Sequence, residues 1–153
     1  MKKQSEAPDQ ASARDVEVAA SLRSIIHRLV KVMRRQTPNK EMLSLTERST
    51  LGLIYQQGKI LPSEAAQVEK VSTQSMSQVI NHLFEIGYIS KTGDENDKRK
   101  VLLSLTPSGK EFVERRRQEK QEWLARTLHE KISPREKEVL AEAITILAKL
   151  MDE

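Results

Sequence analysis

The clearest pattern of apolar and polar positions lies between residues 72 and 87. Apolar side chains recur there at steps of three and four residues, which gathers them on one face of a helix; they are Met76, Val79, Ile80, Leu83 and Phe84. The opposite face is polar and carries Gln74, Ser75, Ser77, Gln78, Asn81 and His82. Ser72 is a favourable N-cap and Gly87 a favourable stop, so the pattern predicts an amphipathic helix between these two residues.

A hairpin is predicted directly after this helix. Residues 88–91 and 101–105 are short runs that contain β-branched or aromatic side chains or alternate in the manner of a strand. The segment 92–99 between them is too polar to pack in a core and is rich in turn-forming residues. It is therefore expected to form the long tip of an antiparallel hairpin.

Caps and periodic apolar positions predict helices on both sides of this segment. We expect them over residues 14–36, from a cap at Thr46 to residue 57, from residue 62, from 107 to about 129, and from 134 onward, with a short third strand at 59–61. Residues 1–13 are mostly polar or charged and are expected to be a disordered tail. The predicted fold class is mainly α with a small β-hairpin.

The helix after Ser72 and the hairpin carry side chains suited to DNA. Glutamine and asparagine offer the paired donor and acceptor that adenine presents in the major groove, and small hydroxyls at the start of a helix can approach base edges. A basic side chain on a hairpin tip can reach the adjacent minor groove; Arg99 is the candidate, with Asp97 able to orient it. The candidate DNA-binding residues are Ser72, Thr73, Gln74, Ser75, Ser77, Gln78, Asp97, Lys98, Arg99 and Lys100.

The run from Asp94 to Gly109 resembles the wing signature of the MarR (multiple antibiotic resistance regulator) family of transcriptional regulators. Other pieces resemble the same family in the same order: Leu45-Thr46-Glu47, Ser63-Glu64-Ala65-Ala66, Val71-Ser72 and Leu83-Phe84-Glu85-Ile86-Gly87-Tyr88-Ile89. The match covers residues 45–110 in detail. Gln78 and His82 depart from it, because relatives often carry arginine or lysine at these positions.

The resemblance implies a winged helix-turn-helix flanked by long N- and C-terminal dimerisation helices. Residues 14–153 would then form a single MarR-like domain, with a core at 45–106 and dimerisation helices at 14–36 and 107–153. The implied protein is a homodimeric repressor that binds a pseudo-palindromic operator in double-stranded DNA. In many relatives a small molecule releases the operator, and a small aromatic or anionic effector is expected here; the candidate pocket residues are Arg23, His27 and Trp123.

Composition excludes several other functions. The chain has no cysteine, which removes disulfides, thiolate metal sites and cysteine-based oxidant sensing. His27, His82 and His129 stand apart from one another and from carboxylate clusters, so no metal, cofactor or enzyme activity is expected. A secretory signal and a membrane span are also absent, which predicts a cytoplasmic protein.

Charge and single residues leave alternatives open. The net charge is +4, but residues 45–106 carry seven basic and seven acidic side chains, so charge alone does not indicate DNA. Arg115, Arg116 and Arg117 are expected on a solvated face paired with nearby glutamates rather than on nucleic acid. A lone tryptophan such as Trp123 is usually part of a core. A winged helix can also serve as a protein-interaction module without specific DNA binding.

Overall fold

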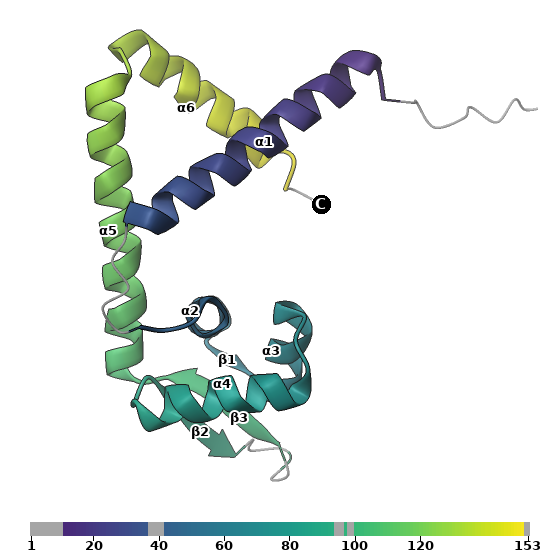
Figure 1. Ribbon diagram of the computed structural model, residues 1–153, viewed down its shortest axis with the longest axis vertical. Helices are drawn as coiled ribbons and strands as arrows, with labels where there is room; N and C mark the ends of the chain where they lie inside the picture. Colours follow the sequence, from purple (N-terminus) through teal and green to yellow (C-terminus); the bar gives the residue numbers. More distant parts are fainter. Residues whose placement is uncertain (1–10, 37–41, 94–96, 98–99, 152–153) are drawn as a thin grey trace, which may run out of the picture. The chain divides into compact units, whose positions relative to one another are not determined.

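The computed structural model describes residues 11–36, 42–93, 97 and 100–151 of the chain (Figure 1). The chain divides into two units, residues 1–36 and 37–153. In the first unit the described residues form one helix, α1 (Ala13–Gln36). The second unit contains α2 (Leu45–Gln57), β1 (Lys59–Ile60), α3 (Pro62–Glu69), α4 (Thr73–Glu85), β2 (Ile89–Gly93), β3 (Val101–Leu105), α5 (Pro107–Lys131) and α6 (Pro134–Ala148).

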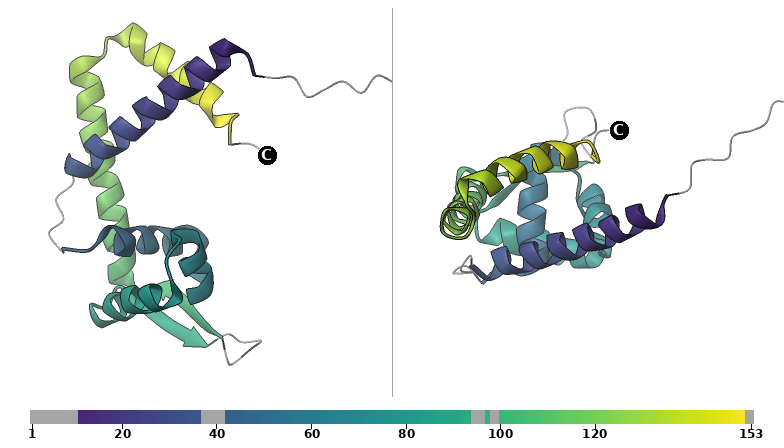
Figure 2. Two further views of the ribbon diagram at one scale, coloured as in Figure 1. Left: turned by 45° about the vertical axis from the view of Figure 1, so that its right-hand side comes forward. Right: turned by 90° about the horizontal axis from the view of Figure 1, so that it is seen from above.

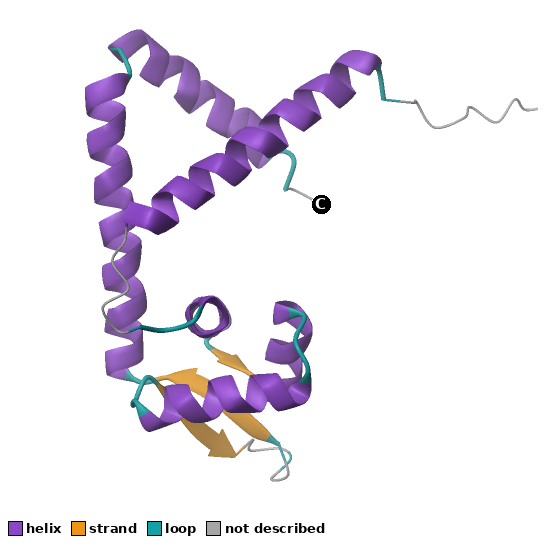
Figure 3. Cartoon of the chain, viewed as in Figure 1, coloured by secondary structure: helices purple, strands orange, loops and turns teal. Residues whose placement is uncertain are grey.

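A small antiparallel sheet with the order β1-β3-β2 supports the second unit (Figure 3). The predicted hairpin is present as β2 and β3, in a register that pairs Ile89 with Leu105 and Gly93 with Val101. The predicted third strand is also confirmed, because Lys59 of β1 pairs with Ser104 of β3. Helices α2, α3 and α4 gather around this sheet (Figure 2). We call these three helices and the sheet the winged lobe.

The core of the winged lobe takes side chains from every one of its elements. The largest fully buried side chains are Leu43, Leu51, Ile54, Ile60, Met76, Leu83, Ile89, Leu103 and Thr50. On α4, Met76, Ile80 and Leu83 are buried as predicted, whereas Phe84 is 49% exposed and was wrongly placed on the inner face. At about 100° per residue, Phe84 lies roughly 80° around the helix from Met76, which moves it to the flank of the apolar stripe.

Side-chain caps fix where the helices begin. The predicted caps at Ser72, Thr106 and Ser133 are confirmed, since each side chain accepts a hydrogen bond from a backbone N–H of its own first turn. The cap of α2 is Ser44 and not Thr46 as predicted. Ser44 has a glutamate three residues later and forms a capping box with it, whereas the residue three after Thr46 is Ser49.

Glu47 completes that capping box and also joins α2 to α4. Its carboxylate accepts a hydrogen bond from the backbone N–H of Ser44 at 2.6 Å and pairs with Nδ1 of His82. The side chain of Glu47 is 11% exposed and that of His82 is 49% exposed. Burial raises the pKa of the Glu47 carboxyl, but the hydrogen bonds from His82 and Ser44 together outweigh burial and hold this pKa below its ordinary value. His82 was expected to stand apart from carboxylate clusters, and it has this one carboxylate partner, which lies 35 positions away in the sequence.

The start of α5 is locked onto the exit of α4. The Thr106 hydroxyl donates to the carbonyl oxygen of Gly87 at 2.6 Å, and the Thr106 N–H donates to that of Tyr88 at 3.1 Å. A Cβ atom on Gly109 would collide with the same Tyr88 carbonyl group, so only glycine permits this approach. One turn later the Phe112 ring stacks on the Tyr88 ring, with 5.0 Å between the ring centroids.

Helices α1 and α6 contain no buried residue. The apolar positions of α1 are exposed over most of its length, including Ile25 at 58% and Ile26 at 49%. On α6, Ile144 is 59% and Leu140 36% exposed. Among the described helices, none has the length and apolarity needed to cross a lipid bilayer.

The Gly109 contact leads to a stability prediction. Gly109→Ala should lower the free energy of unfolding by about 1–3 kcal/mol, because the methyl group must displace backbone atoms of Tyr88. Gly52→Ala is the matched control, since a Cβ there meets no atom within 4 Å and alanine favours a helix interior by about 0.5–1 kcal/mol. Urea denaturation followed by circular dichroism measures both. Equal stability of the two variants would contradict the role given to Gly109.

The Glu47 contacts predict a pH dependence of stability. Glu47→Gln should lower the free energy of unfolding by about 1–3 kcal/mol at neutral pH. Because folding lowers the pKa of this carboxyl, its contribution is complete above the unfolded-chain value of 4.5 and is lost as the pH falls through the folded-state value. Urea titrations from neutral pH to about pH 3 measure this change. Glu136→Gln is the control: it lies in the exposed capping box of α6 and should lower the free energy of unfolding by less. If the difference in unfolding free energy between wild type and Glu47→Gln does not vary with pH, the prediction is refuted.

Candidate nucleic-acid interface

The polar face of α4 is open to solvent beside the hairpin. All six candidates on this segment are exposed, as the amphipathic pattern requires: Ser72, Thr73, Gln74, Ser75, Ser77 and Gln78. Burial of Met76, Ile80 and Leu83 on the other side holds the polar face outward. The sequence therefore positions a row of hydrogen-bonding side chains along one exposed helix face.

Several hydroxyls in this row are used by the helix itself. The Ser72 hydroxyl accepts from the backbone N–H of Ser75 at 3.1 Å and donates to the Ser75 hydroxyl at 2.9 Å. The Ser77 hydroxyl donates to the backbone carbonyl of Thr73 at 2.8 Å. The donor capacity of Ser72 and Ser77 is thus engaged locally, which leaves the exposed amides of Gln74 and Gln78 as the better candidates in this segment for contact with a base edge.

We call the hairpin of β2 and β3, with the segment that joins the two strands, the wing. Two of the four candidates on the wing can be placed. Asp97 is half-buried and its backbone carbonyl accepts from the N–H of Lys100 at 2.8 Å, while Lys100 is exposed. Lys98 and Arg99 lie outside the described residues. Lys100 directly precedes β3, which begins at Val101.

A shallow cleft of about 450 Å³ links α3, α4 and the wing. Its lining consists of Leu61, Pro62, Ser63, Thr73, Ser77, Lys100 and Val101. Thr73, Ser77 and Lys100, all predicted from sequence, are therefore neighbours in space. Ser63 joins them but was not predicted to be functional, because nothing in the sequence shows that the start of α3 borders the wing.

The three consecutive arginines of α5 lie beside aromatic rings, and one of them is buried. Arg116 is 8% exposed, with its guanidinium 5.6 Å from the centroid of the Phe112 ring. Arg117 lies 4.5 Å above the Tyr55 ring, and Arg115 lies 5.8 Å from the Phe112 ring. The expectation of a solvated face is therefore wrong for Arg116, which is buried against Phe112, whereas Arg115 and Arg117 are exposed as expected.

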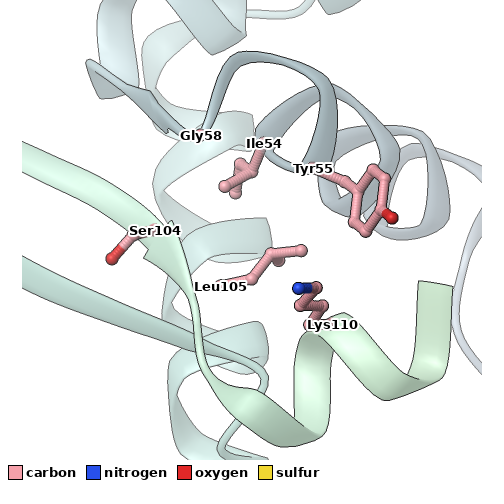
Figure 4. A pocket seen from close by; sticks show the side chains of 6 residues that line it. All are labelled: Ile54, Tyr55, Gly58, Ser104, Leu105 and Lys110. Atoms are coloured by element: carbon pink, nitrogen blue, oxygen red, sulfur yellow. The ribbon is translucent and has the colours of Figure 1, made fainter. Parts of the chain in front are cut away.

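The candidate effector residues belong to two different units. Arg23 and His27 lie on α1, where they line an apolar hollow together with Ala19, Leu22, Ile26 and Val30. Trp123 is half-buried on α5. A further pocket of about 420 Å³, not predicted from sequence, is lined by Ile54, Tyr55, Gly58, Ser104, Leu105 and Lys110 (Figure 4). Within the described ranges, no cluster of three or more His, Asp or Glu side chains is arranged to hold a metal ion.

Known proteins share this architecture. An HTH-type transcriptional regulator of Mycobacterium tuberculosis is 32% identical over 139 residues, which is 91% of this chain and 96% of the relative. A crystal structure of a putative transcriptional regulator from Pseudomonas aeruginosa has a TM-score of 0.79 and 25% identity, covering 94% of this chain and all of the other. A mutant of Staphylococcus aureus MepR bound to an oligodeoxyribonucleotide has the same fold, with a TM-score of 0.65 at 20% identity over 88% and 98% of the two chains.

The family model that matches is described as the MarR family and covers residues 43–101. Its span runs from the last residues before α2 to the first residue of β3, so it contains α4 and the segment that joins β2 to β3. Members of this family are transcriptional regulators and not enzymes. With a winged helix-turn-helix fold and full-length similarity to HTH-type regulators, the chain belongs to the MarR family of DNA-binding transcriptional regulators.

Proposed function

We propose that this regulator is a homodimeric repressor that binds a pseudo-palindromic operator and releases it when a small molecule binds. The observation that carries the proposal is the exposed polar face of α4 beside the hairpin. A helix of this kind fits the major groove, and a hairpin at its side reaches the adjacent minor groove. A cytoplasmic location is part of this proposal, because the protein must reach its operator there.

Six of the ten candidate residues are given a role in this proposal. Gln74 and Gln78 read bases in the major groove, because their exposed amides offer paired donors and acceptors. Arg99 enters the minor groove, and the carboxylate of Asp97 orients its guanidinium. Lys98 and Lys100 bind phosphates. Because the core segment has no net charge, these local contacts rather than a broad basic surface supply the attraction to DNA.

The homodimer is supported by the exposed apolar faces of α1 and α6. Large side chains such as Ile26 and Ile144 would stay in contact with water in an isolated chain. Extended apolar surfaces of this kind mark interaction sites in soluble proteins. A two-fold dimer places two copies of α4 on one face of the duplex, so the operator should contain inverted half-sites with centres about 10 base pairs apart, or a multiple of that.

The effector is proposed to be a small aromatic or anionic molecule. Arg23 and His27 border the apolar hollow on α1, which combines surface for an aromatic ring with a cationic group for an acid. Such a molecule releases DNA only if it binds the DNA-incompetent arrangement of the dimer more tightly than the DNA-bound one. Trp123 is the single tryptophan of the chain, so its emission is the fluorescence signal that ligand titrations follow.

Arg99→Ala tests the DNA-binding roles. Loss of the minor-groove contact should weaken operator binding by about 1–3 kcal/mol and leave the melting temperature unchanged. Gel shifts with a genomically selected operator measure the affinity, and Lys110→Gln on α5 is the control for loss of one exposed positive charge. Identical midpoints for wild type and Arg99→Ala would reject the wing role.

The effector is tested by the same gel-shift titrations in the presence of aromatic acids, together with the emission of Trp123. If neither operator affinity nor emission responds, this compound class is rejected.

Charges placed on α6 test the dimer. The double variant Leu140→Asp with Ile144→Asp should give monomers, because it places two carboxylates on the apolar face. Thr145→Asp is the control, since it adds a charge on the polar side of the same helix and should leave a dimer. Light scattering measures the mass of each variant. A double variant that remains dimeric would show that this face of α6 lies outside the interface.

A further inference from the structure

Lys91 on β2 is held against α4 by the geometry of the sheet. Residues two apart on a strand share a face, so Lys91 lies on the same face as Ile89, which is buried beneath the lobe's helices. The Lys91 ammonium donates a hydrogen bond to Oδ1 of Asn81 at 2.9 Å. It also lies 4.8 Å from the centroid of the Phe84 ring. Two residues of α4 therefore fix the end of a lysine that belongs to the wing.

Lys91 and Asn81 still offer hydrogen-bond donors to a partner in solvent. An ammonium group has three N–H bonds, and one of them is used by Asn81. Because Lys91 occupies the carbonyl oxygen of Asn81, the amide N–H bonds of Asn81 remain for another partner. Asn81 and Lys91 are both exposed, so these donors can be reached from solvent. A partner that fits them carries acceptors and negative charge.

The path of DNA identifies that partner. If α4 lies in the major groove and the wing in the next minor groove, the sugar-phosphate strand between the two grooves must cross the strip between α4 and β2. Asn81 and Lys91 bridge this strip. Asn81 is also in the second half of α4, whereas base edges are read mainly from the first half of a recognition helix. A phosphate therefore fits this position better than a base edge.

We propose that Asn81 and Lys91 form a preorganised clamp for a phosphate of the DNA strand that separates the two grooves. The proposal rests on the docking described under Proposed function. Its advantage over a free surface lysine is entropic, because the Lys91 side chain is already held by Asn81 and Phe84 before DNA arrives. The clamp contributes affinity without sequence preference, and it ties the position of the wing to that of the recognition helix.

Two substitutions in the full-length protein test the clamp. Lys91→Gln removes the charge, and it should weaken binding to operator and non-operator DNA by the same factor, about tenfold. The plot of the logarithm of the association constant against the logarithm of the salt concentration should become less steep. Its slope should shrink in magnitude by about 0.9 for each clamp lost, and so by about 1.8 for a dimer. Lys110→Gln removes a charge elsewhere in the same unit and should change neither quantity.

Asn81→Asp separates a phosphate clamp from a structural link. The new carboxylate would pair with Lys91 more strongly than the amide does, so a purely structural role predicts unchanged affinity. A clamp predicts a larger loss than in Lys91→Gln, about 30-fold or more, because a negative charge then faces the phosphate. Melting temperatures confirm that both variants are folded. A wild-type salt slope in Lys91→Gln, or wild-type affinity in Asn81→Asp, would overturn the proposal.

Failure of the clamp is distinguishable from failure of the proposed docking. If the wing does not enter the minor groove, Arg99→Ala keeps wild-type affinity while the salt slopes still report any phosphate contact of Lys91. If only the clamp is wrong, Arg99→Ala weakens binding and Lys91→Gln behaves like Lys110→Gln. Both measurements use the same operator and the same salt series.

Discussion

Burial of one stripe of α4 determines what the rest of the winged lobe can do. Met76, Ile80 and Leu83 are nearly inaccessible to water, and each such side chain contributes about 1.5–3 kcal/mol of burial free energy. No rotation of α4 about its axis can keep these contacts and change the face that meets solvent. Polar contacts then hold both flanks of the helix, since Glu47 of α2 pairs with His82 and Lys91 of β2 pairs with Asn81.

Local sequence predicted the elements well because their signals are local. The three- and four-residue spacing of apolar positions predicted α4, and Ser72, Thr106 and Ser133 marked helix starts with their own side chains. The cap of α2 was misplaced because threonine is itself a favourable N-cap residue. The correct cap is indicated by Ser44 and Glu47, which have the spacing of a capping box. Phe84 was misplaced because a residue eight positions after Met76 lies about 80° around the helix from it, at the flank of the buried stripe.

The site was only partly predictable because much of it is tertiary. The exposed residues of α4 follow from its amphipathic pattern, and the structure places Thr73, Ser77 and Lys100 along one cleft. By contrast, the side chains of Glu47 and His82 are in contact although they are 35 positions apart in the sequence. Those of Lys91 on β2 and Asn81 on α4 are in contact although they are 10 positions apart. Pairings of this kind depend on how α2, α4 and β2 pack, and no residue spacing within a single element indicates them.

The close approach of Gly109 to Tyr88 makes the first turns of α5 move together with the winged lobe. The hydrogen bonds of Thr106 and the stacked rings of Tyr88 and Phe112 join the first turns of α5 to the exit of α4 and the root of the hairpin. α5 has 25 residues and is therefore about 37 Å long. Because its base is fixed to the lobe in this way, a rotation of the lobe by about 10° displaces the far end of α5 by roughly 6 Å. A rotation that leaves these contacts intact thus becomes a displacement of about one helical turn at the other end of α5.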